Sequence, residues 1–209
     1  MEKNRMILLA SNSPRRRELL QWLNRPFRVC PAAIDERHVQ KTLPAEVSGD
    51  RFAFLVSSLA QEKAHAVAVT KAQPGDLVIG ADTIVVCDQQ VYGKPRNRKE
   101  AQKMLWALSG KTHLVYTGVA IFDAQEDCLC HFAEHAAVRF YPLDAFQKAQ
   151  IEAYLDTDEP YDKAGAYAIQ GRGALLIEAL TGDYYTVMGL PIARLARCLD
   201  ALSSQQRNE

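Results

Sequence analysis

Three consecutive arginines, at 15–17, follow Ser13 and Pro14 near the start of the chain. Serine is a preferred N-cap and proline a preferred first helical residue, so a helix is predicted to begin at Pro14 with the arginines in its first turn. The backbone N–H groups of a helix start attract anions, and guanidinium groups add paired donors for phosphate. An apolar run at 6–10 predicts a strand just before this helix, which is a common phosphate-binding arrangement. The pattern favours an anion site without a glycine-rich fingerprint; the alternative is arginines that extend into solvent.

Asp82 lies in the middle of an apolar segment, LVIGADTIVV at 77–86, that reads as a buried strand. A carboxylate in such a place needs a metal, a cation or a proton. Gly80 beside it is expected to mark a bulge or the close approach of a ligand. The alternative is that Asp82 caps a break in the strand. We favour a functional carboxylate.

Lys63 lies on the apolar face of a helix predicted at 50–71. It is four residues from both Leu59 and Val67, which belong to a stripe at helical spacing. Such a lysine either extends its ammonium group along the surface into water or points it into a cleft toward an anion. In the second case cations would repel one another in an empty site, and Lys63→Ala would leave the melting temperature unchanged or raise it.

The segment DKAGAYAIQGRG, at 162–173, combines small residues with a charged pair and has no helix or strand periodicity. It reads as a shaped loop that lets a ligand approach the backbone. Gln170 in this loop has both a donor and an acceptor for the edge of a base. The alternative is a structured turn in which Gly171 and Gly173 act as breakers.

Composition limits the classes of function. The chain has 209 residues with 25 basic and 25 acidic side chains, so general binding to nucleic acid or to an acidic membrane is not expected. No apolar run is long enough for a membrane span or a secretory signal. The five scattered cysteines suit reduced thiols, which predicts a cytoplasmic location. The group Cys128, Cys130, His131 and His135 lacks the usual paired spacing of zinc ligands, and we expect no zinc site there.

Periodicity and capping residues predict a mixed sheet in an α/β or α+β domain. The length of 209 residues suits one large domain or two small lobes, and we expect a single domain over 1–209. Asn97 with Glu100 predicts a helix start, Gly110 a helix end, and a tight turn at 181–183 predicts a hairpin over 173–188. The predicted strands are 6–10, 27–31, 77–87, 113–123, 129–141, 173–179 and 184–188, and the predicted helices are 14–23, 50–71, 98–108, 144–155 and 191–202.

The chain resembles the Maf family of nucleoside triphosphate pyrophosphatases. The motifs that carry the resemblance run through nearly the whole chain in the family's order: LLASNSPRRRELL, LAQEKA, GADTIVV, GKP, LSGKTHLVYTGVA and DEPYDKAGAYAIQGRGALLIEALTGDYYTVMGLPI. The resemblance implies a long mixed sheet flanked by helices, two lobes around a cleft, a fold similar to that of inosine triphosphatase-like enzymes, and a homodimer. It also implies hydrolysis of a nucleoside triphosphate to the monophosphate and pyrophosphate with a divalent metal, most simply Mg²⁺ or Mn²⁺.

The resemblance also implies roles for residues at matching positions. Asp82 matches the catalytic proton acceptor, and Glu36 matches an acidic partner that helps hold the metal; Asp35 beside it leaves open which carboxylate faces the cleft. The cations and the hydroxyl expected at the triphosphate are Ser13, Arg15, Arg16, Lys63 and Lys94.

Substrate choice is associated in the family with the positions of Arg15, Thr83 and Gln170. This set resembles the branch that acts on dTTP and UTP, and on modified pyrimidines such as 5-methyl-UTP; the other branch acts on 7-methyl-GTP or CTP. Two further classes stay open: a nucleotide-binding regulator of septation with incidental hydrolysis, and a nucleotidyl transferase. Retention of a base as well as the cations favours an enzyme, because a binding protein needs no base.

Overall fold

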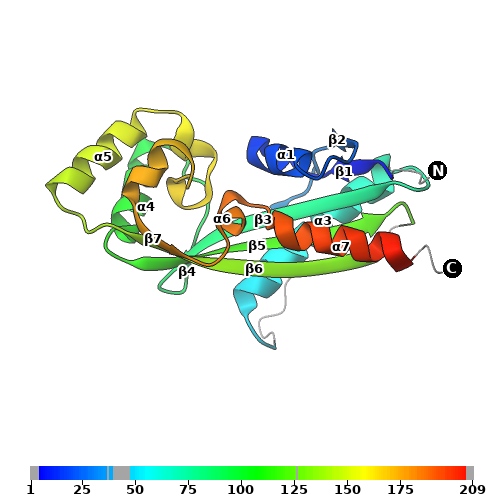
Figure 1. Cartoon of the computed structure of the whole chain (residues 1–209). Helices are drawn as coiled ribbons and strands as arrows, with labels where there is room; N and C mark the ends of the chain where they lie inside the picture. Colours follow the sequence, from blue (N-terminus) through cyan, green and yellow to red (C-terminus); the bar gives the residue numbers. More distant parts are fainter. Residues whose placement is uncertain (1–4, 37, 40–47, 126, 206–209) are drawn as a thin grey trace. The chain divides into compact units, whose positions relative to one another are not determined.

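The computed structural model describes residues 5–36, 38–39, 48–125 and 127–205. Its sheet has the order β2-β1-β3-β5-β6-β7, with β4 paired to β3; β1 is parallel to β2 and β3, while β4 and β7 pair antiparallel with β3 and β6. The predicted long mixed sheet flanked by helices is confirmed (Figure 1). The strands are β1 Ile7–Leu9, β2 Phe27–Val29, β3 Leu77–Cys87, β4 Gln90–Tyr92, β5 Thr112–Asp123, β6 Cys128–Phe140 and β7 Ile177–Thr181.

The helices lie between and after these strands. The α-helices are α1 Pro14–Gln21, α3 Arg51–Lys71, α4 Arg98–Leu108, α5 Ala145–Leu155, α6 Tyr184–Met188 and α7 Ile192–Gln205, and the 3-10 helices are η1 Glu159–Asp162, η2 Ala164–Ala166 and η3 Gly171–Leu176. In the described part of the chain, no helix combines the length and the apolar character that a membrane crossing requires.

The chain forms two compact units. Unit 1 comprises 1–82, 117–134 and 189–209, and unit 2 comprises 83–116 and 135–188. Strands β3, β5 and β6 each contribute residues to both units.

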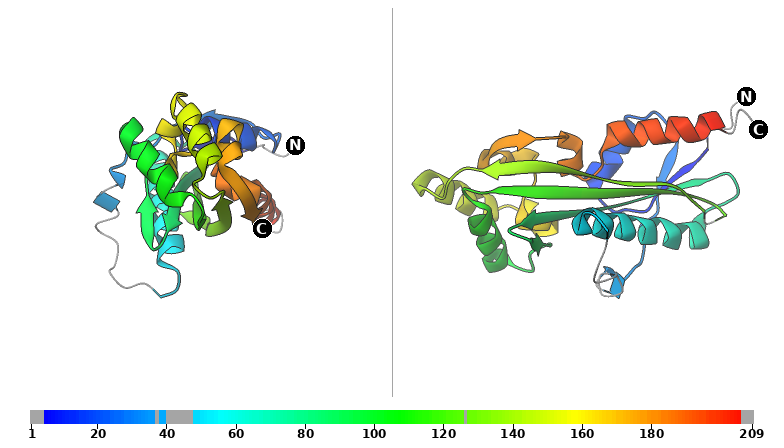
Figure 2. Two further views of the ribbon diagram at one scale, coloured as in Figure 1. Left: turned by 90° about the vertical axis from the view of Figure 1, so that its left-hand side faces the viewer. Right: turned by 90° about the horizontal axis from the view of Figure 1, so that it is seen from below.

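The core of unit 1 lies between α3 and the strands β1, β3 and β5. A Cβ atom at Gly80 would lie 2.1 Å from the carbonyl oxygen of Ala60, and one at Gly118 would lie 2.2 Å from that of Val56. These two glycines let α3 pack directly on the backbone of two strands. The close approach at Gly80 is therefore made by a helix and not by a ligand, which corrects the expectation from sequence. Helix α7 lies on the opposite face of the sheet from α3 (Figure 2).

Local capping sets the helix starts of unit 1. The Ser13 hydroxyl accepts from the backbone N–H of Arg16 at 3.5 Å, and α1 begins at Pro14, as predicted. The Asp50 carboxylate accepts from the N–H groups of Phe52 and Ala53 and starts α3. Strand β3 runs without a break through Asp82, so the alternative of a capped break is wrong.

Unit 2 confirms the predicted boundaries of α4. Asn97 accepts from the N–H of Glu100 at 2.9 Å, and Gly110 follows the helix with φ of 72°. Asp88 and Gln89, with φ of 50° and 63°, form the two-residue turn that joins β3 to β4, a short strand that sequence reasoning missed.

The predicted hairpin over 173–188 is wrong. Residues 171–176 form a 3-10 helix, β7 spans only 177–181, and α6 occupies 184–188. Asp183 explains the difference, because its carboxylate accepts from the N–H of Thr186 at 2.7 Å and from its hydroxyl at 2.8 Å. This cap starts a helix in a sequence whose aromatic and β-branched residues favour strand. Strand β7 pairs instead with β6.

Candidate functional site

Asp82, Lys63 and Glu36 form an ion cluster in unit 1. The Lys63 Nζ atom lies 2.5 Å from Asp82 Oδ1 and 2.6 Å from Glu36 Oε1. The side chains of Lys63 and Asp82 are only 12% and 10% exposed, whereas that of Glu36 is 52% exposed. Two carboxylates from different parts of the chain thus share one ammonium group.

The packing of α3 brings this cluster together. Lys63 precedes Ala64, which contacts β3 at Gly80, and Asp82 lies two residues further along the same face of that strand. The ammonium group therefore points into the protein and does not extend into water. It faces carboxylates, so the expected repulsion among cations is wrong for this residue. The ion pairs lead us to expect that Lys63→Ala lowers the melting temperature.

Burial and neighbouring charges shift the pKa of Asp82 in opposite directions. Burial raises the pKa of Asp82, and the positive charges of Lys63 and Arg16 oppose that rise, while Glu36 adds to it. The cations around Asp82 favour its ionised form, which is the form that can accept a proton.

Arg16 joins three segments of unit 1. Its Nε donates to the Gly189 carbonyl at 2.8 Å, and its Nη1 donates to the Ala81 carbonyl at 2.7 Å and to the Ser11 hydroxyl at 3.1 Å. Burial lowers the pKa of Arg16, and the charges of Asp82 and Glu36 oppose this. The guanidinium group predicted at the phosphates thus holds the backbone beside Asp82. Sequence reasoning missed Gly189 and Ser11, which no local pattern relates to an arginine.

The remaining residues predicted at the N-terminal anion site lie around α1. The Ser13 hydroxyl caps the helix, and Arg15 is half-buried in the first turn. Their contact with phosphate stays a prediction.

Glu36, and not Asp35, faces Lys63. The Asp35 carboxylate instead accepts from the backbone N–H of His38 at 3.2 Å. Residues 32–36 do not form a strand, so their orientation follows from this local cap and from the ion pair.

Three predicted site residues, Thr83, Lys94 and Gln170, belong to unit 2. Lys94 is exposed, and the carbonyl of Gly93 before it accepts from the N–H of Gly165 at 3.1 Å. Unit 2 therefore brings the segment of Lys94 against the loop 162–173 that contains Gln170. Thr83 and Gln170 are half-buried.

Buried aromatic groups hold this loop. Tyr167 and His113 are hydrogen-bonded through the hydroxyl and Nε2 at 2.8 Å, and both rings contact Phe140. Burial raises the pKa of Tyr167 and lowers the pKa of His113 to about 4. The hydroxyl of Tyr154 accepts from the N–H of Ala168 at 3.1 Å. The loop is thus a structured segment with fixed backbone, a property that sequence reasoning inferred only from its small residues.

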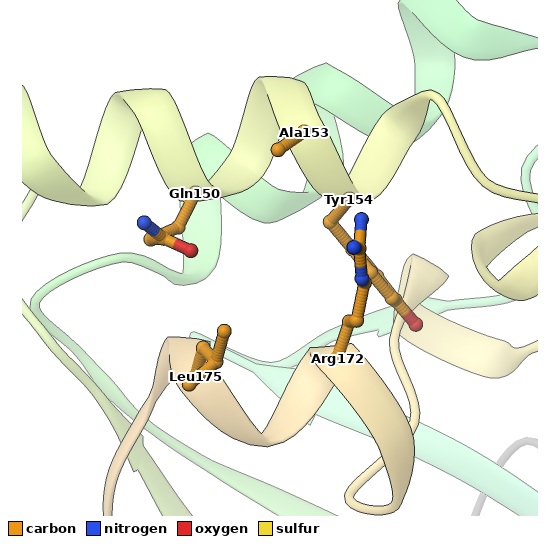
Figure 3. Close-up of a pocket in the computed structure, with 5 residues that line it drawn as sticks. All are labelled: Gln150, Ala153, Tyr154, Arg172 and Leu175. Atoms are coloured by element: carbon orange, nitrogen blue, oxygen red, sulfur yellow. The ribbon is translucent and has the colours of Figure 1, made fainter.

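A small pocket of about 190 Å³ lies elsewhere in unit 2 (Figure 3). Gln150, Ala153 and Tyr154 of α5 face Arg172 and Leu175 of η3 across it. None of the residues predicted for catalysis or specificity lines this pocket.

Three of the four cysteine and histidine side chains at 128–135 contact different residues in the structure. Cys130 contacts Cys198, His131 Nδ1 lies 3.1 Å from the hydroxyl of Ser57, and His135 packs on Tyr116. Among the described residues, no three His, Cys, Asp or Glu side chains are arranged to hold a metal ion.

Comparison with known proteins gives consistent matches. The sequence profile described as Maf-like protein matches residues 6–202. A dTTP/UTP pyrophosphatase from Symbiobacterium thermophilum is 49% identical over 193 residues, which are 92% of each chain. A dTTP/UTP pyrophosphatase from Bacillus cytotoxicus is 45% identical over 94% of this chain and 95% of its own. A solved dITP/XTP pyrophosphatase from Mycobacterium abscessus aligns over 97% of this chain at 12% identity with a TM-score of 0.39, a likeness too weak to support a conclusion.

Proposed function

Because this chain belongs to the Maf-like protein family, we propose that it hydrolyses dTTP and UTP to the nucleoside monophosphate and pyrophosphate. The observation that carries the proposal is the identity of 49% and 45%, over nearly the full length, to two proteins named dTTP/UTP pyrophosphatase. The cluster of Asp82, Lys63 and Glu36 supports it, because a protein that only binds a nucleotide needs no buried proton acceptor.

In the proposed reaction, a water molecule attacks the α-phosphorus and Asp82 accepts its proton. The charge of Lys63 opposes the rise that burial causes in the pKa of Asp82, and Arg16 donates a hydrogen bond to the carbonyl of the preceding residue, Ala81. Arg15 and Lys94 are proposed to neutralise the phosphates, whose charge must be offset before a nucleophile approaches.

Asp82 and Glu36 are the proposed ligands of a divalent metal. Their nearer oxygen atoms each lie within 2.6 Å of one Nζ atom, and so are separated by no more than about 5 Å. Mg²⁺ and Mn²⁺ accept hard oxygen ligands, and Mg²⁺ commonly takes only one or two carboxylates and completes its shell with water and phosphate oxygens. This donor set fits that chemistry. When bound, the ion would neutralise phosphate charge and lower the pKa of the attacking water.

Gln170 is the proposed reader of the base. Uracil and thymine present a carbonyl and an N–H side by side, which one amide can pair with through its donor and its acceptor. A mispaired base leaves a buried polar group unsatisfied, at a cost of about 1–3 kcal/mol, or roughly 5- to 150-fold in kcat/KM. Modified pyrimidines such as 5-methyl-UTP present the same edge. Cytosine presents the donor and the acceptor in the reverse order, so discrimination against CTP requires that the amide of Gln170 be held in one orientation. Guanine also presents a carbonyl beside an N–H, so discrimination against 7-methyl-GTP requires a pocket sized for a pyrimidine ring.

The test is a panel of triphosphates assayed with Mg²⁺ or Mn²⁺, with products identified by ³¹P NMR in ¹⁸O-water. We expect dTTP and UTP to give the highest kcat/KM and the label to appear in the monophosphate. Gln170→Leu should lower kcat/KM for UTP and narrow its advantage over CTP. Label in pyrophosphate would overturn the site of attack, and preference for 7-methyl-GTP would overturn the substrate assignment. Absence of hydrolysis with normal nucleotide binding would favour the regulator of septation.

Three further assignments stay predictions: that the two units act as one domain over 1–209, that the protein is a homodimer, and that it is cytoplasmic. The match of one family profile over 6–202 supports the first.

A further inference from the structure

Two free thiols of unit 1, Cys130 and Cys198, lie in direct contact. Their Sγ atoms are 3.2 Å apart, although 68 residues separate them in sequence. Both side chains are half-buried, so small solutes are not shut out from them. A disulfide bond is about 2.05 Å long, so the two sulfur atoms need to approach by only about 1.2 Å to form one.

The contact belongs to a matched pair of faces on β6 and α7. Cys130, Phe132 and Glu134 alternate along β6 and therefore share one face of the strand. Arg194 and Cys198 are one helical turn apart on α7. Arg194 pairs with Glu134 and lies over the Phe132 ring at 4.4 Å, while Cys198 meets Cys130. The two contacts of Arg194 thus fix the register that holds the thiols together. Figure 1 shows α7 running alongside β6.

We propose that Cys130 and Cys198 form a site of reversible oxidation, at which a peroxide converts the two thiols into a disulfide between β6 and α7. Among the described residues, the other three cysteines offer no equivalent contact between sulfur atoms: Cys30 is half-buried, Cys87 is buried, and Cys128 is exposed at the start of β6. Nothing in the proposed hydrolysis uses these thiols, so the site is independent of it.

The reaction balances with one peroxide. The Cys198 thiolate attacks one peroxide oxygen, the O–O bond breaks, and one water leaves with a sulfenic acid on Cys198. The Cys130 sulfur then attacks the Cys198 sulfur, the S–O bond breaks, and the proton of Cys130 leaves with the second water. Each chain loses two electrons and two protons, and the peroxide is reduced to water. Burial and the neighbouring Cys198 raise the pKa of Cys130 to about 12, so Cys130 is assigned the second step, in which it attacks a sulfur that is already oxidised.

The bond would close a long loop of the chain. The segment 135–188, which is one of the two parts of unit 2, lies entirely between the two cysteines. A cross-link that closes a long loop limits the unfolded chain and stabilises the folded one. We therefore expect the oxidised protein to melt about 5–10 °C above the reduced protein.

The experiment treats the full-length protein with hydrogen peroxide and counts free thiols, maps peptides without reduction, and measures melting. The expected result is loss of two of the five thiols, a peptide linked through Cys130 and Cys198, and a rise in melting temperature that dithiothreitol reverses. Cys128→Ser is the matched control and should behave like the wild type, whereas Cys198→Ser should give neither the linked peptide nor the rise.

Several outcomes would overturn the proposal. They are a cross-link through Cys128, loss of two thiols in Cys198→Ser at the rate of the wild type, and persistence of all five thiols in the folded protein under conditions that oxidise the urea-unfolded chain. Peptide mapping of the unmutated protein decides the matter even if a serine variant folds poorly.

Discussion

Replacement of Lys63 by methionine would test the ion cluster most directly, because it removes the charge while it keeps the length of the side chain. In the wild type, the ammonium group lies 2.5 Å from Asp82 and 2.6 Å from Glu36. Removing one partner of a buried ion pair costs about 3–5 kcal/mol, because the other charge is left without compensation. Arg16 remains near Asp82, and the half-exposed Glu36 can turn to water, so we expect a loss of about 2–3 kcal/mol.

For a chain of this size, a loss of 1 kcal/mol lowers the melting temperature by roughly 2–4 °C, so Lys63→Met should melt roughly 4–12 °C below the wild type. The measurement is thermal unfolding followed by circular dichroism, without metal or nucleotide. Lys71→Met, at an exposed position in the last turn of the same helix, is the control and should lose no more than about 1 kcal/mol.

The pH dependence identifies the group responsible. Without Lys63, burial still raises the pKa of Asp82 but its largest opposing charge is gone. The folded pKa of Asp82 already lies above the unfolded value in the wild type, and the loss of Lys63 raises it further. The added penalty in the variant is therefore complete above its folded pKa and disappears below the unfolded value of about 3.9. The gap in melting temperature should narrow as the pH is lowered from about 7.5 to about 5. A gap below about 1 °C at neutral pH, or one that widens on acidification, would refute the reasoning.

Three other changes have definite expected results. Asp82→Asn should lower kcat for UTP by roughly 100-fold or more while nucleotide still binds, and a rate within a few-fold of the wild type would exclude Asp82 as the proton acceptor. Arg16→Lys keeps the charge, but one ammonium group cannot replace the hydrogen bonds that the guanidinium group donates to three acceptors, so the melting temperature should fall by roughly 4–8 °C. Arg17→Lys, at an exposed position, is the control and should melt like the wild type. Equal melting temperatures of the two variants would show that these hydrogen bonds of Arg16 are dispensable. The pKa of His113 is about 4 in the folded protein and about 6.5 in the unfolded chain, so the unfolded state binds the proton first and the free energy of unfolding should fall by about 3 kcal/mol as the pH drops through this range. In urea unfolding at a series of pH values, His113→Gln should lack this loss of stability. A variant with the same pH profile as the wild type would contradict the assignment to His113.

The sequence by itself determined those features that depend on neighbouring residues. Ser13 and Pro14 start α1, Asn97 starts α4, and Gly110 ends it, because a cap is made by residues within one turn of each other. The placement of Asp82 in a buried apolar segment and of Lys63 on the apolar face of α3 also followed from periodicity.

The prediction from neighbouring residues was wrong where strand propensity and a helix cap competed. The aromatic and β-branched residues at 184–188 indicated a strand, but the cap supplied by Asp183 made them a helix. Strand β7 pairs with β6 and not with a strand over 184–188, because the pairing of strands is decided by the whole sheet and not by the turn alone.

Only the tertiary structure decided which side chains meet across long separations. The choice of Glu36 over Asp35 depends on where α3 places the Lys63 ammonium group. Arg16 donates to Gly189, which is 173 residues away, and Cys130 meets Cys198 across 68. These contacts follow from how closely α3 packs on Gly80 and how α7 registers on β6, because packing at close range is set by the shapes of both surfaces together and no local pattern contains it.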